Sequence, residues 1–129
     1  MTFDAIGIAG SGMTAHRVWL DALSDNLANM NTAVSGDDTA FQQRFVAVQA
    51  DAAGGVEPPS VVWGDDEGRL VYEPENPLAN EAGYVRYPDI DLGEQMSHLI
   101  LAQRGYQASA AVVDRAKTSY EAALQIGRR

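Results

Sequence analysis

The stretch that decides the fold is residues 92–124, LGEQMSHLILAQRGYQASAAVVDRAKTSYEAAL. Two interleaved series recur in it every seven residues, with alternating steps of four and three residues. The first series is Leu92, Leu99, Tyr106, Val113 and Tyr120. The second series is Met96, Gln103, Ala110, Lys117 and Leu124. This spacing predicts one long helix with a single seam, beginning near Pro88 and Asp89.

The predicted helix needs a long partner. A helix over residues 89–127 would be roughly 55 Å long, and the rest of the chain is too short to wrap a core around it. Residues 3–31 can supply the partner, because they carry the same repeat. One series is Ile6, Met13, Leu20 and Leu27, and the other is Ala9, His16, Leu23 and Met30. We interpret His16, the polar break in this seam, as a residue that fixes register.

The middle of the chain has a different character. Residues 36–88 hold all five prolines and lose the heptads. Short strand-like runs at 45–48, 61–63, 70–72 and 84–87 are separated by glycine, proline and acidic residues. We therefore predict a mainly α fold with a small β region. Residues 1–35 and 89–129 form terminal helices paired as a coiled coil, and they flank a loop-rich β segment at 36–88.

Both helices carry apolar side chains away from the seam. These residues are Val18 and Trp19 on the first helix and Ile100, Leu101 and Val112 on the second. A tryptophan left in water would make a sticky patch. A larger bundle within the chain could cover these faces, but the chain lacks further long helices to form one. We therefore expect them to be contacts between subunits.

Amino-acid composition argues against several classes of partner and site. The formal net charge is −9 and Lys117 is the single lysine, which argues against nucleic acid and against anionic lipid as direct partners. There is no cysteine, so disulfides and thiolate-bound zinc are excluded. Asp4 lies where a secretory signal would be positive, and no apolar run is long enough to span a bilayer. We expect a cytoplasmic protein, or one exported without a cleaved signal peptide.

Catalytic, cofactor and metal motifs are weak. The glycines at 7, 10 and 12 lack the spacing of a phosphate-binding loop. His16 and His98 each lack a second ligand at helical spacing. The run 65–68 lacks glycine at the sixth position of a calcium loop. We therefore expect no enzyme, no cofactor and no bound metal.

Three motifs support a family assignment. The N-terminal motif resembles the N-terminal motif of flagellar rod and hook proteins. It begins with residues 11–15 and continues with Asn26, Leu27, Ala28, Asn29, Asn31 and Thr32. The C-terminal motif lies in residues 103–109 and looks like the C-terminal motif of the same family. It includes Arg104, Tyr106 and Gln107. The middle motif is very similar to that of proximal-rod subunits of the bacterial flagellar basal body. It comprises Tyr72, Glu73, Pro74, Asn76, Pro77, Leu78, Gly83, Tyr84 and Pro88.

The resemblance implies a mechanical role. In such proteins the terminal helices pair into an inner domain, and copies stack helically into a hollow rod that crosses the periplasm. The expected partners are other copies of the chain, other rod proteins, the motor base and the export apparatus. The resemblance also implies type III export without signal cleavage, and torque transmission through packed helices. We expect the acidic region Tyr72–Pro88 to recognise the adjacent proteins.

Two rival hypotheses remain open. One is that the chain is a subunit of a different segment of the flagellar axial structure, but the middle motif argues against this hypothesis. The other is an acidic cytoplasmic adaptor or chaperone of flagellar export, which would use the same helices for binding. An adaptor should be folded and of fixed stoichiometry when purified, whereas a rod subunit should assemble in many copies. An unrecognised enzyme is a distant third.

Overall fold

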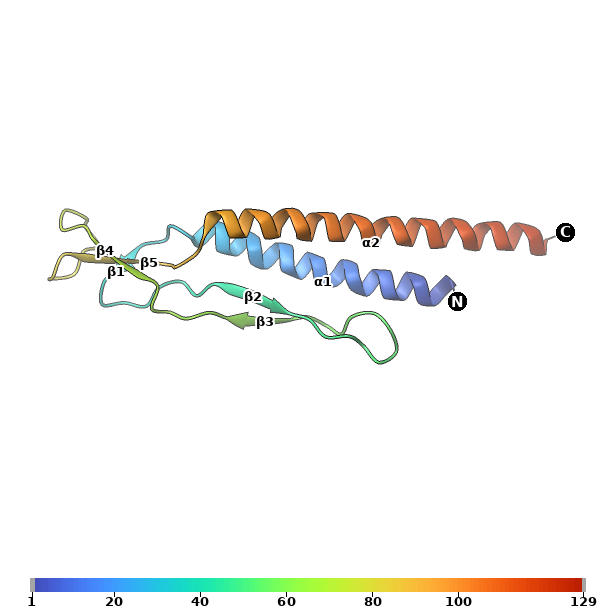
Figure 1. Ribbon diagram of the computed structural model, residues 1–129, viewed down its shortest axis with the longest axis horizontal. Helices are drawn as coiled ribbons and strands as arrows, with labels where there is room; N and C mark the ends of the chain where they lie inside the picture. Colours follow the sequence, from blue (N-terminus) through green and yellow to red (C-terminus); the bar gives the residue numbers. More distant parts are fainter. Residues whose placement is uncertain (1, 129) are drawn as a thin grey trace. The chain divides into compact units, whose positions relative to one another are not determined.

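The computed structural model describes residues 2–128. The elements in chain order are α1 (Thr2–Asn29), β1 (Val34–Ser35), β2 (Arg44–Ala47), β3 (Ser60–Trp63), β4 (Arg69–Tyr72), β5 (Tyr84–Tyr87) and α2 (Leu92–Gly127) (Figure 1). Two long helices pack together, and a small antiparallel β region lies between them in the sequence. This confirms the predicted mainly α class with an inserted β segment.

The chain divides into two compact units. Unit 1 comprises the described residues of 1–20, 46–60 and 100–129, and unit 2 comprises residues 21–45 and 61–99. Both helices and the two-stranded β2–β3 ribbon pass from one unit into the other. These units follow packing, whereas the predicted division at residues 35 and 88 follows secondary structure.

In unit 1 the two helices run antiparallel (Figure 1). A β-carbon added to Gly12 would lie 3.1 Å from Oγ of Ser109, and one added to Gly105 would overlap the His16 ring. Gly12 therefore lies opposite Ser109, and His16, four residues later in α1, lies opposite Gly105, four residues earlier in α2. The most buried apolar residues here are small, namely Ala9, Ala15, Ala102 and Ala116. Small side chains at these positions let the two backbones approach closely.

Unit 2 contains a three-stranded antiparallel sheet with the strand order β1-β5-β4. Val71 is opposite Val85, and the neighbouring pair is Tyr72 with Tyr84. Because side chains alternate between the faces of a strand, Val71 and Val85 share one face and the two tyrosines share the other. Val85 is fully buried, whereas Tyr72 is 64% exposed. The valine face is therefore the inner face of this sheet.

Local signals explain the helix ends in unit 2. Asp91 caps α2, because its Oδ1 accepts a hydrogen bond from the Glu94 N–H at 2.7 Å. At the end of α1, the Thr32 N–H donates to the Asn29 carbonyl at 3.0 Å. The helix therefore ends within the N-terminal motif, at Asn29.

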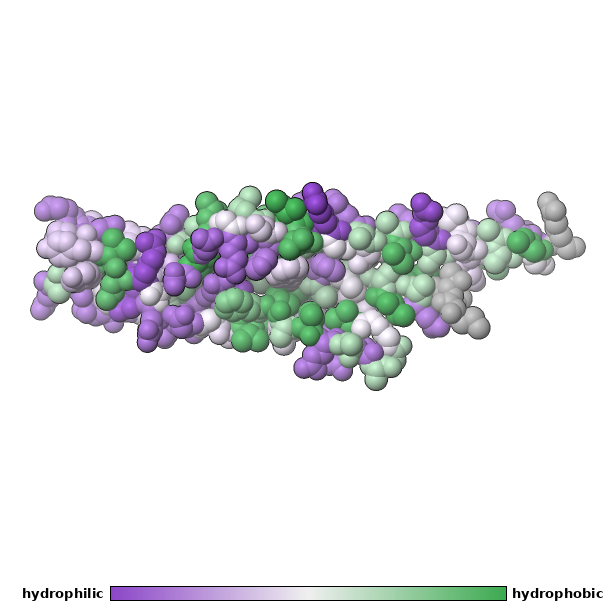
Figure 2. Space-filling model, viewed as in Figure 1, coloured by the Kyte–Doolittle hydropathy of each residue, from purple (hydrophilic) through white to green (hydrophobic). Residues whose placement is uncertain are grey.

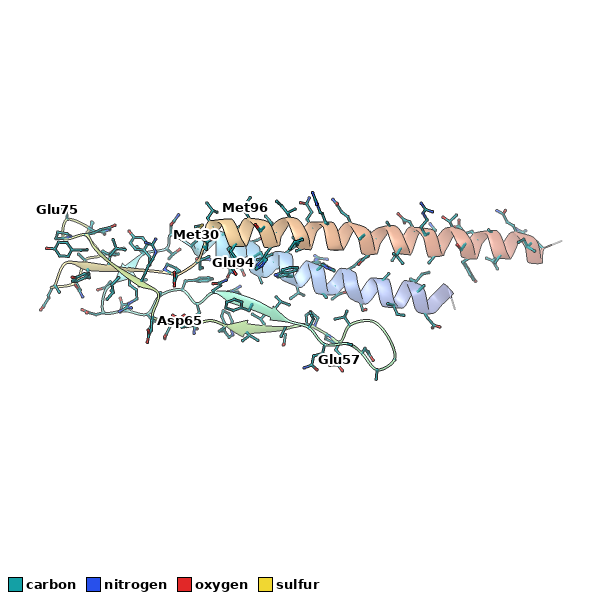
Figure 3. All side chains as sticks on the ribbon, in the orientation of Figure 1. Met30, Glu57, Asp65, Glu75, Glu94 and Met96 are labelled. Carbon is teal, nitrogen blue, oxygen red and sulfur yellow. The ribbon has the colours of Figure 1, made fainter. Side chains whose placement is uncertain are left out.

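The residues predicted for the seam are buried or half-buried on α1, whereas on α2 half of them are exposed. On α1, the predicted Leu23 is buried and Ile6, Met13, Leu20 and Leu27 are half-buried. On α2, Leu99, Tyr106 and Val113 are half-buried. Met96, which is labelled in Figure 3, is 43% exposed, and Tyr120 and Leu124 are 37% and 51% exposed.

The difference on α2 has two physical causes. The buried residues Gln95, Ala102 and Ala116 each lie one position before a member of the predicted series, because the contact selects small or hydrogen-bonded side chains over large ones. In addition, α2 has 36 residues and α1 has 28. Residues 121–127 of α2 are exposed, so Leu124 has no counterpart on α1.

Candidate interaction surfaces

Unit 1 has an open apolar groove of about 700 Å³. Residues from α1, from α2 and from the loop between β2 and β3 line it. They are Ala5, Ile8, Ala9, Gly12, Gly55, Val56, Ala108, Ser109 and Val112. Most of them are small, so the groove is wide enough to admit side chains from outside.

The loop between β2 and β3 is fixed to α1 by one polar contact. The Val56 N–H donates to Oγ of Ser11 at 3.0 Å, and the same hydroxyl donates to the Ile8 carbonyl at 2.7 Å. Gly55 has φ +91° and lies so close that a β-carbon there would crowd Ser11. Glycine is required at this position for both reasons. The loop therefore lies directly against α1 and forms one wall of the groove.

Trp19 contributes to a second cavity within unit 1. This cavity, of about 260 Å³, is lined by Gly12, Ala15, His16, Trp19, Val46, Val48 and Val56. The sequence favoured contacts with another subunit for Trp19 and Val18. In the structure both residues are half-buried, and Trp19 lines a cavity with the ribbon of its own chain. The signal that could have shown this is the alternation of Val46 and Val48, which marks one face of a strand.

The apolar residues of α2 named for subunit contacts are on the surface. Ile100 is 47% exposed, Leu101 is 57% exposed and Val112 is 49% exposed. Figure 2 shows apolar surface interrupting the hydrophilic surface of the molecule. Val112 also lines the apolar groove, and exposed large apolar side chains of this kind are typical of a protein interface.

A buried polar cluster organises unit 2. Asn26 is fully buried, and its Nδ2 donates to the Arg44 carbonyl at 2.9 Å and to Oε1 of Gln95 at 3.0 Å. Its Oδ1 accepts from the Arg44 N–H at 2.8 Å. The side-chain amide of Asn26 thus forms with the backbone of Arg44 the same pair of hydrogen bonds that a neighbouring β-strand would form.

Arg44 adds electrostatic contacts to this cluster. Its guanidinium forms an ion pair with Asp25, and it lies 5.7 Å from the ring centroid of Phe41 and 4.9 Å from that of Trp63. Cation–π contacts of this geometry are attractive. The N-terminal motif is therefore joined to both strands of the β2–β3 ribbon.

The middle motif forms the connection between β4 and β5. Backbone turns close at residues 73–76, 76–79 and 80–83. The Asn76 Nδ2 donates to Oε2 of Glu73 at 2.8 Å, and Oδ1 of Asn80 accepts from the Tyr84 N–H at 2.9 Å. The asparagines therefore shape the loop.

Glu73 also acts on Tyr87, whose hydroxyl donates to both carboxylate oxygens at 3.2–3.3 Å. Partial burial of the Tyr87 phenol, followed by this hydrogen bond and the Glu73 charge, raises its pKa above the ordinary value. Arg69 lowers it by a smaller amount. The contact holds the loop against β5 while Tyr87 remains protonated.

The other motif residues are distributed over the surface of their units. Asn29 is half-buried and donates from Nδ2 to the Asp25 carbonyl at 2.9 Å. Pro88 is buried. The exposed members are Ala28, Asn31, Thr32, Pro74, Pro77, Leu78, Tyr84, Arg104 and Gln107. The motif therefore combines structural positions with positions that a partner can reach.

Neither a metal site nor a membrane span was found in residues 2–128. No three His, Cys, Asp or Glu side chains gather there so that they could hold an ion. No helix in this part of the chain is long and apolar enough to cross a bilayer.

Two family profiles match the chain. The profile described as "Flagella basal body rod protein" matches residues 6–33, and that of the "Flagellar basal body rod FlgEFG protein C-terminal" matches residues 81–126. The chain is 36% identical over 126 residues to the flagellar basal-body rod protein FlgC of Salmonella typhimurium, covering 94% of each chain. It is 30% identical to FlgC of Bacillus subtilis over 98% of each chain, and 36% identical to FlgC of Aquifex aeolicus over 92% of each.

Proposed function

The chain belongs to the FlgC family of flagellar basal-body rod proteins, and from this premise we propose that unit 1 is the part that joins it to neighbouring subunits of the rod. One observation carries the proposal. The groove formed by α1, α2 and the loop between β2 and β3 is apolar and open, and Val112 belongs to it while 49% exposed. A neighbouring helix would cover this surface and remove it from water.

The residues that would form the subunit contact are Ile100, Leu101 and Val112. Fully burying an aliphatic side chain contributes roughly 1.5–3 kcal/mol. Each of these is about half exposed, so three of them contribute roughly 2–5 kcal/mol per copy before the entropy cost of association. A single contact of this size is weak. Many repeated contacts along an assembly would make it stable.

The finer features of the assembly follow from the same premise. We propose that the segments 1–35 and 89–129 pair as a coiled coil, and that copies stack helically around a channel used by the export apparatus. The β-containing segment 36–88 would then form the subunit-specific part. Torque would pass through the close-packed helices, which have little room to slip.

The position in the cell is also part of the proposal. The assembled chain would form part of the rod as it crosses the periplasm, after type III export without a cleaved signal peptide, and would contact the motor base. No catalytic role is proposed, because its relatives are named as rod proteins. The adaptor alternative is not favoured for the same reason.

The test uses the full-length chain in a motile host that lacks its own copy. Leu101→Asp places a charge in the proposed contact, and it should reduce swimming and remove the chain from purified hook–basal bodies, as measured by mass spectrometry. Gln103→Asp is the matched control, because Gln103 is also exposed but lies on a different face of α2. Normal incorporation of the Leu101 variant would refute the assignment of this face.

A further inference from the structure

Charge is divided unequally between the two units. Unit 2 holds thirteen of the eighteen acidic residues and three of the nine Lys and Arg residues, which gives it a net charge of −10. The rest of the chain has five acidic and six basic residues, for a net charge of +1. The acidity of the protein therefore belongs almost entirely to one unit.

The three arginines of unit 2 are engaged within that unit. Arg44 pairs with Asp25, and the guanidinium of Arg69 lies 5.2 Å from the ring centroid of Tyr87. Arg86 donates to the Glu67 carbonyl and, at 2.7 Å, to the Gly36 carbonyl. These cations fix the loops in place and do little to neutralise the acidic surface.

The sheet of unit 2 presents an apolar outer face. Leu70, Tyr72 and Tyr84 lie on the face opposite the buried Val85, and they are 52%, 64% and 39% exposed. The rings of Tyr72 and Tyr84 meet edge to face, with centroids 5.3 Å apart. We call these three residues the outer sheet face. The two tyrosine rings are ordered by one another, so little of their side-chain entropy is lost when a partner covers them.

Exposed carboxylates border the outer sheet face. Glu75, which is labelled in Figure 3, and Glu81 are exposed in the connection between Tyr72 and Tyr84. Glu67 is exposed beside β4, and its carbonyl binds Arg86 of the adjacent strand. Asp37 is exposed and accepts a hydrogen bond from the Asn80 side chain at 2.9 Å. Arg86 lies opposite Leu70 on the same face, where its guanidinium donates to the Glu67 and Gly36 carbonyls. The segments next to the outer sheet face carry four exposed carboxylates.

We propose that the outer sheet face docks a different protein whose surface carries Lys and Arg around an apolar centre. A second copy does not fit, because two units of charge −10 would repel each other, and unit 1, at +1, offers little compensation. A basic partner would be steered to this face and aligned on it. The inference rests on the proposed function, since it assigns unit 2 to unlike neighbours and unit 1 to like neighbours.

Site-specific photocrosslinking tests the proposal in the assembled structure. The photoreactive residue p-benzoylphenylalanine replaces Tyr72 in one variant, Leu70 in a second and Leu101 of unit 1 in a third. Hook–basal bodies are purified after irradiation, and the crosslinked peptides are identified by mass spectrometry. We expect the two unit 2 variants to crosslink to a peptide of net positive charge from another protein.

The outcomes separate the two proposals. Crosslinks from Tyr72 and Leu70 to a second copy, or to an acidic or neutral peptide, would overturn the docking proposal. So would their absence when the Leu101 variant crosslinks in the same preparation. If the unmodified chain is missing from hook–basal bodies altogether, the proposed function fails, and the docking proposal fails with it.

A charge experiment checks the electrostatic part. Changing Glu67, Glu75 and Glu81 together to glutamine should lower the crosslink yield from Tyr72 about tenfold, the lower end of what electrostatic steering supplies. The matched control neutralises three exposed acids of unit 1, with Glu57→Gln, Asp114→Asn and Glu121→Gln, and should change the yield less than about twofold. Equal effects of the two triple variants would show that charge near the outer sheet face does not select the partner.

Discussion

Gly105 offers a direct test of the contact between the helices of unit 1. In a Gly105→Ala variant, the added β-carbon would overlap Nε2 and Cδ2 of His16 and lie 2.8 Å from Cε1. The same ring is held on its other side, where Nδ1 lies 2.7 Å from the Gly12 carbonyl. The imidazole cannot move away without losing this hydrogen bond.

The size of the effect follows from three contributions. Alanine is favoured over glycine in a helix by about 1 kcal/mol. Overpacking costs about 1–3 kcal/mol, and the lost hydrogen bond costs about 1 kcal/mol. The net destabilisation is therefore about 2 kcal/mol, which lowers the Tm of a chain of this size by roughly 6–10 °C.

Urea unfolding of the full chain, followed by far-UV circular dichroism, measures this change. Gly7→Ala is the matched control, because a β-carbon at Gly7 meets nothing within 4 Å and should stabilise the helix by about 0.5–1 kcal/mol. In a His16→Ala background the overlap is absent, so Gly105→Ala should become stabilising as well. If Gly105→Ala has the same sign with and without His16, the reasoning about this contact is wrong.

Three further predictions concern unit 2 and the helix core. Asn26→Ala removes three hydrogen bonds at a fully buried site, so we expect a loss of about 2–4 kcal/mol in urea unfolding, whereas the exposed Asn31→Ala should change stability by less than about 0.5 kcal/mol. Leu23 is 2% exposed, and Leu23→Ala should cost about 2–5 kcal/mol in the same assay. Because folding raises the pKa of Tyr87, its contribution to stability is fully present below its unfolded pKa of about 10 and is lost as the pH rises through the folded pKa. Glu73→Gln should lower the pKa of Tyr87 in a phenolate absorbance titration, and an unchanged titration would contradict the role given to this carboxylate.

Local sequence pattern predicted most of the secondary structure. The runs at 45–48, 61–63, 70–72 and 84–87 correspond to β2, β3, β4 and β5 within about one residue at each end. These strands are recognisable because β-branched and aromatic residues alternate between turn residues. β1 was missed. It has two residues, and only its pairing with β5 makes it a strand.

The residues that lie between the two helices were harder to predict than the existence of the helices. A heptad analysis counts large apolar residues, whereas most of the fully buried residues on the two helices, Leu23 apart, are alanines and amides. The buried Asn26 and Gln95 have no apolar signature, and their burial depends on a peptide group at Arg44 that is distant in sequence. Trp19 was assigned to another subunit because it lies off the predicted seam, whereas Val46 of β2 and the following Val48 line its cavity within the same chain.

Small, large apolar and charged side chains are distributed differently over the molecule. Small residues such as Ala9, Gly12 and Ala102 lie where the chain contacts itself, so its own helices need no large side chains to associate. Large apolar residues such as Leu101 in unit 1 and Tyr72 in unit 2 remain exposed, which is unfavourable in a free chain and useful only when another protein covers them. The near-neutral charge of unit 1 permits copies of the chain to meet there, whereas the charge of −10 on unit 2 opposes this. Under the two proposals, one sequence would separate contacts with like subunits from contacts with unlike ones.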